Sequence, residues 1–134
     1  MPRPSRELER QVISLAAGRC EYCRLPEYVS DLPFHLDHII AEKHRGLTIL
    51  GNLAWACFSC NMHKGPNVAG IDPVTDEVVR LFRPRQDVWK EHFTWRGAWL
   101  HGQTPIGRTT VMVLEMNDPD AVMLRELLLV EGTF

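Results

Sequence analysis

The sequence has no hydrophobic run approaching the ~20 residues that a membrane-spanning helix requires, so no membrane partner is expected. Its first residues, Met-Pro-Arg-Pro-Ser-Arg-Glu, lack the apolar core of a secretory signal, which predicts a cytoplasmic protein. Positive charge is not in excess either: 15 Lys and Arg against 17 Asp and Glu give a net charge of −2. This balance argues against a protein that coats nucleic acid nonspecifically, because such binding needs abundant cations. A small basic patch beside a cleft is compatible with it.

Cysteine is scarce as well, but its four residues are patterned as Cys20-x-x-Cys23 and Cys57-x-x-Cys60. Two such tight turns can close a tetrahedral shell of four thiolates around one zinc ion. In a reducing cytoplasm the pattern favours a metal over disulfides. The alternative is four cysteines that pack simply as small hydrophobic residues. A closed four-thiolate shell leaves no open coordination position, so the expected Zn²⁺ is structural.

Periodicity and capping signals predict an α+β domain. Proline directly after a capping residue marks two helix starts, at Thr104-Pro105 and Asp118-Pro119. Strict alternation of apolar residues predicts a strand over 34–41, and residues 67–73 are expected to be irregular. The other expected elements are helices over 5–18 and about 58–65, a strand over 77–82, a short turn or helix over 88–93 and a hairpin over 94–100.

The segment between the two cysteine pairs contains His35-Leu36-Asp37-His38, two imidazoles and a carboxylate of the kind used in metal-dependent hydrolysis. Alternation along a strand puts His38 on one face and both His35 and Asp37 on the other. An ideal strand therefore cannot aim Asp37 and His38 into one site. A strand end or a bulge near residue 38 is needed, and His35 is expected to support the fold.

Together these residues resemble the HNH (His-Asn-His, ββα-metal) endonuclease family in its form with two zinc knuckles. The matching motifs follow the family's order: the first cysteine pair, His35 to Ile40, Gly51-Asn52-Leu53, and Cys57-x-x-Cys60-Asn61-x-x-Lys64-Gly65. The rest of the chain is similar to small stand-alone bacterial members through Gly-Ile-Asp-Pro at 70–73 and Thr-Pro-Ile-Gly-Arg at 104–108.

The resemblance implies a zinc-braced ββα-metal (His-Me finger) core with an N-terminal helix and a C-terminal β-hairpin plus helices. We expect a single domain over 1–134, in which 18–66 are the HNH core and 67–134 are an extension packed on it. The implied activity is an endonuclease that hydrolyses phosphodiester bonds, with DNA as the expected partner and substrate.

The family's roles carry over position by position. His38 matches the general base that takes a proton from the attacking water, a task that suits an imidazole with an unperturbed pKa of ~6.5. Asp37 matches a ligand of the catalytic Mg²⁺ or Mn²⁺, which polarises the scissile phosphate. Asn52 matches the middle asparagine, whose amide bonds backbone across the strand pair and holds the loop that orients His38.

One position departs from the family pattern. The family's metal-binding histidine directly follows the second C-x-x-C, and here that residue is Asn61. His63 lies two residues on, and a helical rotation of ~200° turns it away from Asn61. We therefore expect Asn61 as the second ligand of the catalytic ion, with His63 as the alternative if the helix starts in another register. Lys64 shares the face of Asn61, and it and Arg45 are expected to contact phosphate.

Two other functions stay open. The first is a zinc-braced nucleic-acid-binding module whose nuclease chemistry has lapsed, which Asn61 and the acidic net charge favour. The second is a zinc-braced protein-interaction domain of the ribbon or treble-clef type, which would not require Asp37, His38 or Asn52 beside the knuckles.

The large apolar residues outside the motifs have a simpler interpretation. Packing in the core or in the hairpin is expected for the tryptophans and for three methionines of the last helices, namely Trp55, Trp89, Trp95, Trp99, Met112, Met116 and Met123.

Overall fold

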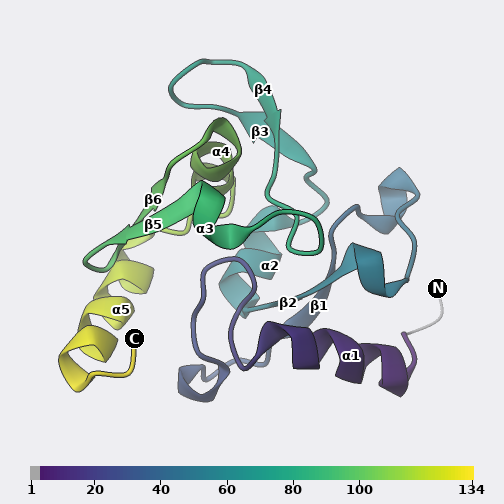
Figure 1. Cartoon of the computed structure of the whole chain (residues 1–134), viewed down its shortest axis with the longest axis horizontal. Helices are drawn as coiled ribbons and strands as arrows, with labels where there is room; N and C mark the ends of the chain where they lie inside the picture. The colour runs from purple at the N-terminus through teal and green to yellow at the C-terminus, as the bar shows by residue number, and fades with distance from the viewer. Residues whose placement is uncertain (1–3) are drawn as a thin grey trace.

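The computed structural model describes residues 4–134, which form five α-helices and three two-stranded antiparallel hairpins (Figure 1). The helices are α1 (Arg6–Ala16), α2 (Phe58–Lys64), α3 (Trp89–His92), α4 (Pro105–Val113) and α5 (Pro119–Glu131). The strands are β1 (His35–His38), β2 (Leu53–Ala56), β3 (Ala69–Ile71), β4 (Val78–Arg80), β5 (Phe93–Arg96) and β6 (Trp99–Gly102). This mixture is the α+β class that the sequence predicts.

The first hairpin and the helix after it form the ββα unit. β1 and β2 pair without a break, from His35 opposite Ala56 to His38 opposite Leu53. α2 follows at once because Cys57 is its N-cap, and the Cys57 sulfur accepts the backbone N–H of Cys60. The second C-x-x-C is therefore the first turn of α2.

The N-terminal helix covers this unit. Ser5 caps α1 by accepting the backbone N–H of Leu8, and Glu7 and Glu9 complement the positive end of the helix dipole. The helix packs against β2 and buries Val12. The expected helix is confirmed, with its end at Ala16 instead of residue 18.

The C-terminal extension, at the top and left of Figure 1, shares a core with the first cysteine pair. The Tyr22 ring meets the edge of Phe82 with 6.4 Å between centroids, and the Trp89 indole donates to the Tyr22 carbonyl over 2.8 Å. Arg85 forms an ion pair with Glu21, and both side chains are largely buried. The extension is thus joined to the Cys20–Cys23 turn by apolar, polar and ionic contacts.

Within the extension, the two tail motifs meet each other. The Arg108 guanidinium donates to both carboxylate oxygens of buried Asp72, over 3.0 and 2.8 Å, and this pairing holds the pKa of Asp72 well below its usual range. A Cβ on Gly70 would lie 2.5 Å from the Val113 side chain, so β3 approaches α4 closely. The 70–73 and 104–108 motifs therefore fasten the β3–β4 hairpin to α4.

Several expectations about the extension need correction. The expectation that residues 67–73 are irregular is wrong, because β3 pairs there with β4. Met116 is buried, but Met112 and Met123 are 43% and 59% exposed. Trp99 is likewise exposed, because alternation in β6 directs Leu100 and Gly102 inward instead.

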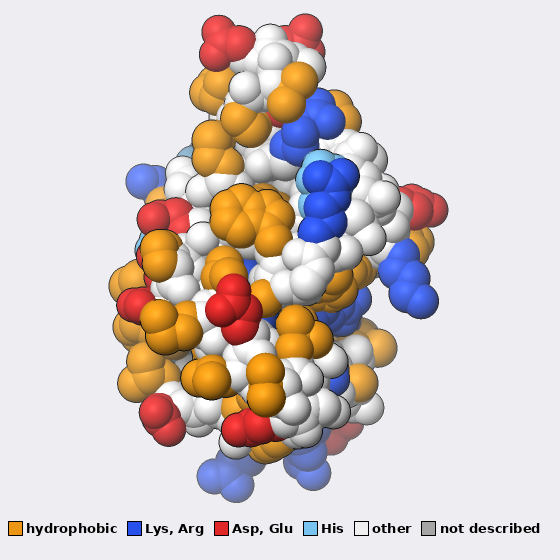
Figure 2. Space-filling model, turned by 90° about the vertical axis from the view of Figure 1, so that its left-hand side faces the viewer, with side chains coloured by type: hydrophobic (Ala, Val, Ile, Leu, Met, Phe, Trp, Pro, Cys, Tyr) orange, Lys and Arg blue, Asp and Glu red, His pale blue; other side chains and the backbone are white. Residues whose placement is uncertain are grey.

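The side of the molecule seen in Figure 2 carries hydrophobic side chains over α5 with acidic side chains between them. The exposed members on this helix are Met123, Leu127, Leu129 and Val130. Across residues 4–134, every helix is too short or too polar to cross a lipid bilayer.

Candidate metal centre and active site

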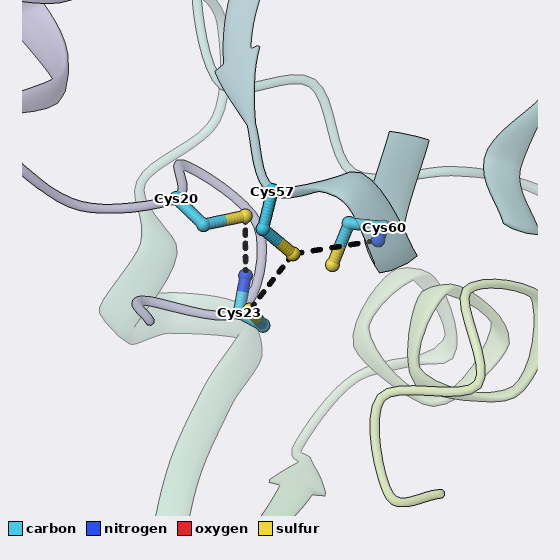
Figure 3. Close-up of side chains that lie close together, drawn as sticks. All are labelled: Cys20, Cys23, Cys57 and Cys60. Atoms are coloured by element: carbon cyan, nitrogen blue, oxygen red, sulfur yellow. Dashed lines mark hydrogen bonds between the residues drawn. The ribbon is translucent and has the colours of Figure 1, made fainter. Parts of the chain in front are cut away.

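The four cysteines come together in one buried cluster. Figure 3 shows the Cys20 and Cys23 side chains on the turn after α1 facing Cys57 and Cys60 at the start of α2. Their four sulfur atoms all lie within 4.8 Å of one another, and no disulfide joins them. The 3.7 Å between the sulfurs of Cys23 and Cys57 is close to the ~3.8 Å edge of a tetrahedron with Zn–S bonds of ~2.3 Å. The cluster is a zinc site with a closed thiolate shell.

The chemistry of the cluster also fits a cation. Hydrogen bonds from the neighbouring cysteines lower the pKa of the Cys57 thiol, whereas hydrogen bonding within the cluster and burial raise the pKa values of Cys23 and Cys60. Deprotonation of all four requires a positive charge among them, which a zinc ion supplies.

Asn52 makes three hydrogen bonds to backbone across the loop that links β1 to β2. Its Oδ1 accepts the N–H of Ile40 over 2.8 Å, and its Nδ2 donates to the carbonyls of Ile40 and Leu47 over 3.0 and 2.8 Å. The loop closes tightly here, since a Cβ on Gly46 would lie 1.6 Å from the Ile40 carbonyl oxygen. Asn52 therefore fixes the conformation of residues 40–47, directly after His38.

His38 is the last residue of β1, and its imidazole lies among polar groups of this loop. Its Nε2 is 2.9 Å from the Thr48 hydroxyl and 3.8 Å from a carboxylate oxygen of Glu42. The other oxygen of Glu42 is buried and has no hydrogen-bond partner among the described residues. The His38 side chain is 18% exposed, so solvent reaches the edge of this group.

Asp37 points to the opposite side of the strand. It is 4% exposed, accepts the Tyr22 hydroxyl over 2.6 Å and accepts the Lys64 ammonium over 3.2 Å. Burial raises the pKa of the Asp37 carboxyl, although the ammonium and the hydroxyl act in the opposite direction. Burial, reinforced by the Asp37 charge, raises the pKa of the Tyr22 hydroxyl. Asp37 is thus one member of a closed polar network inside the fold.

Lys64 differs from its expected position. It is 1% exposed, and besides Asp37 it donates to the His38 carbonyl over 3.0 Å. A side chain held in this way cannot present its charge to a phosphate at the surface. This arrangement gives no support to the expected phosphate contact of Lys64, because the carboxylate on the neighbouring strand holds the ammonium in the interior.

The strand register accounts for the separation of Asp37 and His38. β1 is regular and ends at His38, so the needed strand end is present but no bulge turns the two side chains to one face. The link between them is instead the Lys64 ammonium, which bonds the Asp37 side chain and the His38 backbone together.

The α2 residues lie in the expected register. The helix begins at Phe58, and His63 is directed toward the extension, where its Nε2 is 3.0 Å from a Glu115 carboxylate oxygen. Asn61 is partly exposed and directly follows the zinc ligand Cys60. His63 and Asn61 therefore lie in different environments. Because the helix starts in the expected register, the structure gives no support to His63 as the alternative ligand.

The remaining predicted residues lie at the periphery. Arg45 is exposed in the loop after β1, with a φ of 66°. His35 is partly buried, with its ring 6.1 Å from that of Phe58, as expected for a residue that supports the fold.

Three residues around the site were not predicted: Tyr22, Glu42 and Thr48. Tyr22 lies inside the first C-x-x-C, and its contact with Asp37 depends on two segments far apart in the sequence. Glu42 stands four residues after His38, a spacing that could have suggested an interaction across a tight turn.

The comparison with protein families agrees with this geometry. Residues 20–67 match the family model described as HNH endonuclease. The match starts at the first zinc ligand and ends just after α2, so it contains both cysteine pairs and the ββα unit. Searches of curated proteins and of solved structures found no match to the chain. Residues 20–67 are therefore an HNH endonuclease domain with a zinc-braced ββα-metal fold.

Proposed function

We propose that this protein is an endonuclease that hydrolyses phosphodiester bonds in DNA, with His38 as the general base. The observation that carries the proposal is the position of His38 at the end of β1, with its Nε2 among polar groups at the edge of the solvent. Asn52 supports the same assignment of His38, because it fixes the loop that follows this residue in the chain.

The polar groups around His38 suit a proton transfer. The imidazole would take a proton from water as the water oxygen forms its bond to phosphorus, and the bond to the leaving oxygen breaks on the far side. The imidazolium so formed would be stabilised by the Glu42 carboxylate, 3.8 Å from Nε2. Thr48 would hold the ring at a fixed tilt through its 2.9 Å contact.

The proposed holders of a catalytic Mg²⁺ or Mn²⁺ are Asp37 and Asn61. Both offer the hard oxygen donors that these ions prefer, and a bound ion supplies charge neutralisation at the phosphate. Asn61 is partly exposed, whereas Asp37 is engaged with Lys64 and Tyr22. Ion binding by Asp37 therefore requires the Lys64 ammonium to release the carboxylate, so we expect weak metal affinity and activity at millimolar rather than micromolar metal.

The experiment is cleavage of supercoiled plasmid, single-stranded DNA and RNA with Mg²⁺, with Mn²⁺ and without added metal. We expect His38→Ala to lower the rate by ~10²–10⁴-fold, the usual effect of losing a general base. His101→Ala is the matched control, since His101 lies on β6 outside the domain. Equal cleavage by wild type and His38→Ala would exclude His38 as the base. Binding of DNA without cleavage under every metal condition would favour the lapsed module.

A further inference from the structure

A cavity of about 420 Å³ lies outside the HNH active site, and none of its lining residues belongs to the site around His38. It lies between the turn of the first cysteine pair, the β5–β6 hairpin and the end of the chain after α5. Three cationic and three aromatic side chains line it: Arg19, Arg24, Lys90, Trp89, Trp95 and Phe134.

The charged side chains that line this cavity are all cations. Arg19, Arg24 and Lys90 line it, and no carboxylate side chain does. Within residues 4–134, Arg10, Arg80, Arg85 and Arg108 are paired with carboxylates, whereas these three cations form no ion pair within 4.0 Å. In a chain with a net charge of −2, these three side chains concentrate positive charge at one place on the molecule. This charge attracts an anion.

The walls are aromatic. The Trp89 and Trp95 rings are 5.9 Å apart at an interplanar angle of 36°, and the Phe134 ring meets Trp95 edge-on at 4.8 Å. The Arg24 guanidinium lies over Trp89 at 5.1 Å, and that of Arg19 lies over Phe134 at 5.8 Å. Indole rings and guanidinium planes are both surfaces on which a nucleobase stacks.

Arg19 and Arg24 flank the first cysteine pair, and hydrogen bonds fix the turn on which they lie. The Arg19 side chain donates to the Arg24 carbonyl over 3.0 Å, and the Arg24 N–H donates to the Cys20 carbonyl over 2.9 Å. Trp89 is fixed by its 2.8 Å bond to the Tyr22 carbonyl. A pocket built on these contacts is formed before a ligand arrives, which lowers the conformational entropy lost on binding.

We propose that this cavity binds a nucleotide, with the base against the aromatic walls and the phosphate on Arg19, Arg24 and Lys90. A flat ring joined to an anion is the ligand that this combination of walls and charges selects. The volume lies within the ~300–1,000 Å³ of small-molecule sites. The nucleotide could be a free mononucleotide or an unpaired nucleotide of a strand bound to the protein.

The zinc site is the other charge near these arginines, because four thiolates around Zn²⁺ leave two negative charges on the cluster. Arg125 also lies near the cluster, because it lines the same small cavity as Cys23, Cys57 and Cys60. Lys90 belongs to α3 and is exposed at the cavity mouth, so the zinc cluster does not account for its position.

The test is calorimetric titration of the zinc-loaded full chain without added divalent ions. The probes are deoxyadenosine 5′-monophosphate, a 5′-phosphorylated single-stranded oligodeoxyadenylate, deoxyadenosine and inorganic phosphate. We expect one of the two nucleotide probes to bind, with deoxyadenosine and phosphate each at least tenfold weaker. Binding of the mononucleotide identifies a free nucleotide as ligand, and binding of the oligonucleotide alone identifies a strand.

Trp95→Leu and Lys90→Gln should each weaken nucleotide binding by on the order of tenfold, because they remove a stacking wall and a phosphate contact respectively. The matched controls are Trp99→Leu and Lys43→Gln, which change exposed residues outside the cavity. Zinc content and melting temperature verify the fold of each variant, and Lys90→Gln at an exposed position keeps the test valid if Trp95→Leu unfolds. No binding of either nucleotide at millimolar concentration, or equal binding by the cavity variants and the controls, overturns the proposal. Cleavage is not involved, so failure here leaves the proposed nuclease activity unaffected.

Discussion

Lys64 is among the most buried side chains of the molecule, and within residues 4–134 Asp37 is the carboxylate that balances its charge. Because its ammonium also holds the His38 carbonyl, this residue couples the interior to the strand end that carries the imidazole. A family pattern reports which residue types recur at a spacing. It does not report whether a lysine at that spacing points outward to a phosphate or inward to a carboxylate, since that depends on which oxygen atoms the folded strand places beside it.

Lys64→Met should destabilise the fold by about 3–5 kcal/mol, because it leaves the Asp37 carboxylate buried without its counterion. Urea unfolding of the zinc-loaded protein measures this loss, with exposed Lys43→Met as the control. The double variant Asp37→Leu with Lys64→Met should recover part of the stability, since neither charge is then buried. If Lys64→Met unfolds at the same urea concentration as Lys43→Met, the pair does not stabilise the fold.

Substitutions at Asn61 and His63 test which of these two α2 residues binds the catalytic ion. Asn61→His should keep or raise cleavage and tighten Mn²⁺ binding, because a neutral amide is a weaker ligand for a divalent ion than an imidazole is. His63→Ala should be mild, since the His63 ring is directed to Glu115. Cleavage rates and Mn²⁺ titrations of both variants give the ranking. An inactive His63→Ala beside an unaffected Asn61→Ala would reverse the assignment.

At the scale of secondary structure, the ion pair between Arg108 and Asp72 stabilises the packing of the β3–β4 hairpin on α4. The Arg108 guanidinium lowers the pKa of Asp72, so the folded state holds this carboxylate ionised more strongly than the unfolded chain does. The resulting stability is fully present above the unfolded pKa of ~3.9 and is lost as pH falls below it.

Asp72→Asn should therefore unfold at lower urea concentration than wild type at pH 6, with the difference shrinking between pH 4 and pH 2. Unfolding midpoints of both proteins across this range measure the effect, and comparison of the two cancels the loss of zinc that acid causes in each. A difference that is constant with pH would show that Asp72 stabilises the fold through packing and neutral hydrogen bonds and not through its charge.

The elements with strong local signals were predicted well, and those without were not. α1 has a serine cap and acidic residues in its first turn, and α4 and α5 have Thr104-Pro105 and Asp118-Pro119 at their starts, so all three were located. β3 has three residues and a glycine in its middle, which carry no alternation, and its strand conformation comes from β4 and from close approach to α4. Tertiary contacts decide such a segment.

At the scale of the whole molecule, the zinc cluster joins two segments separated by the entire β1–β2 hairpin. The purified protein should contain about one zinc ion per chain, and Cys57→Ala should be insoluble or far less stable, because a structural zinc ion contributes its binding free energy to folding. Metal analysis and circular dichroism measure both. Wild type treated with a strong chelator is the control and should lose structure in the same way. A folded, metal-free protein would contradict the assignment.

The candidate site was predictable to the extent that it is local in sequence. The cysteine pairs were located from their spacing, and His38 and Asn52 were proposed from the resemblance to the HNH family. The hydrogen bonds of Asn52 to backbone are compatible with the bracing role that the resemblance implies. The Tyr22–Asp37 contact, the burial of Lys64 and the cavity beside Trp89 all bring together residues that are distant along the chain. Their positions follow from the packing of the extension, which no motif encodes.

The first cysteine pair depends on contacts with the extension: Tyr22 contacts Phe82 and Trp89, and Glu21 pairs with Arg85. These contacts determine how short a fragment of this chain can be transplanted into another protein. An excised fragment ending at residue 67 would contain every motif of the family, yet it would leave Glu21 buried without its arginine and one side of Tyr22 uncovered. A chimaera that borrows this HNH domain therefore needs the chain through at least α3, and the boundary of the family match is not a safe place to cut.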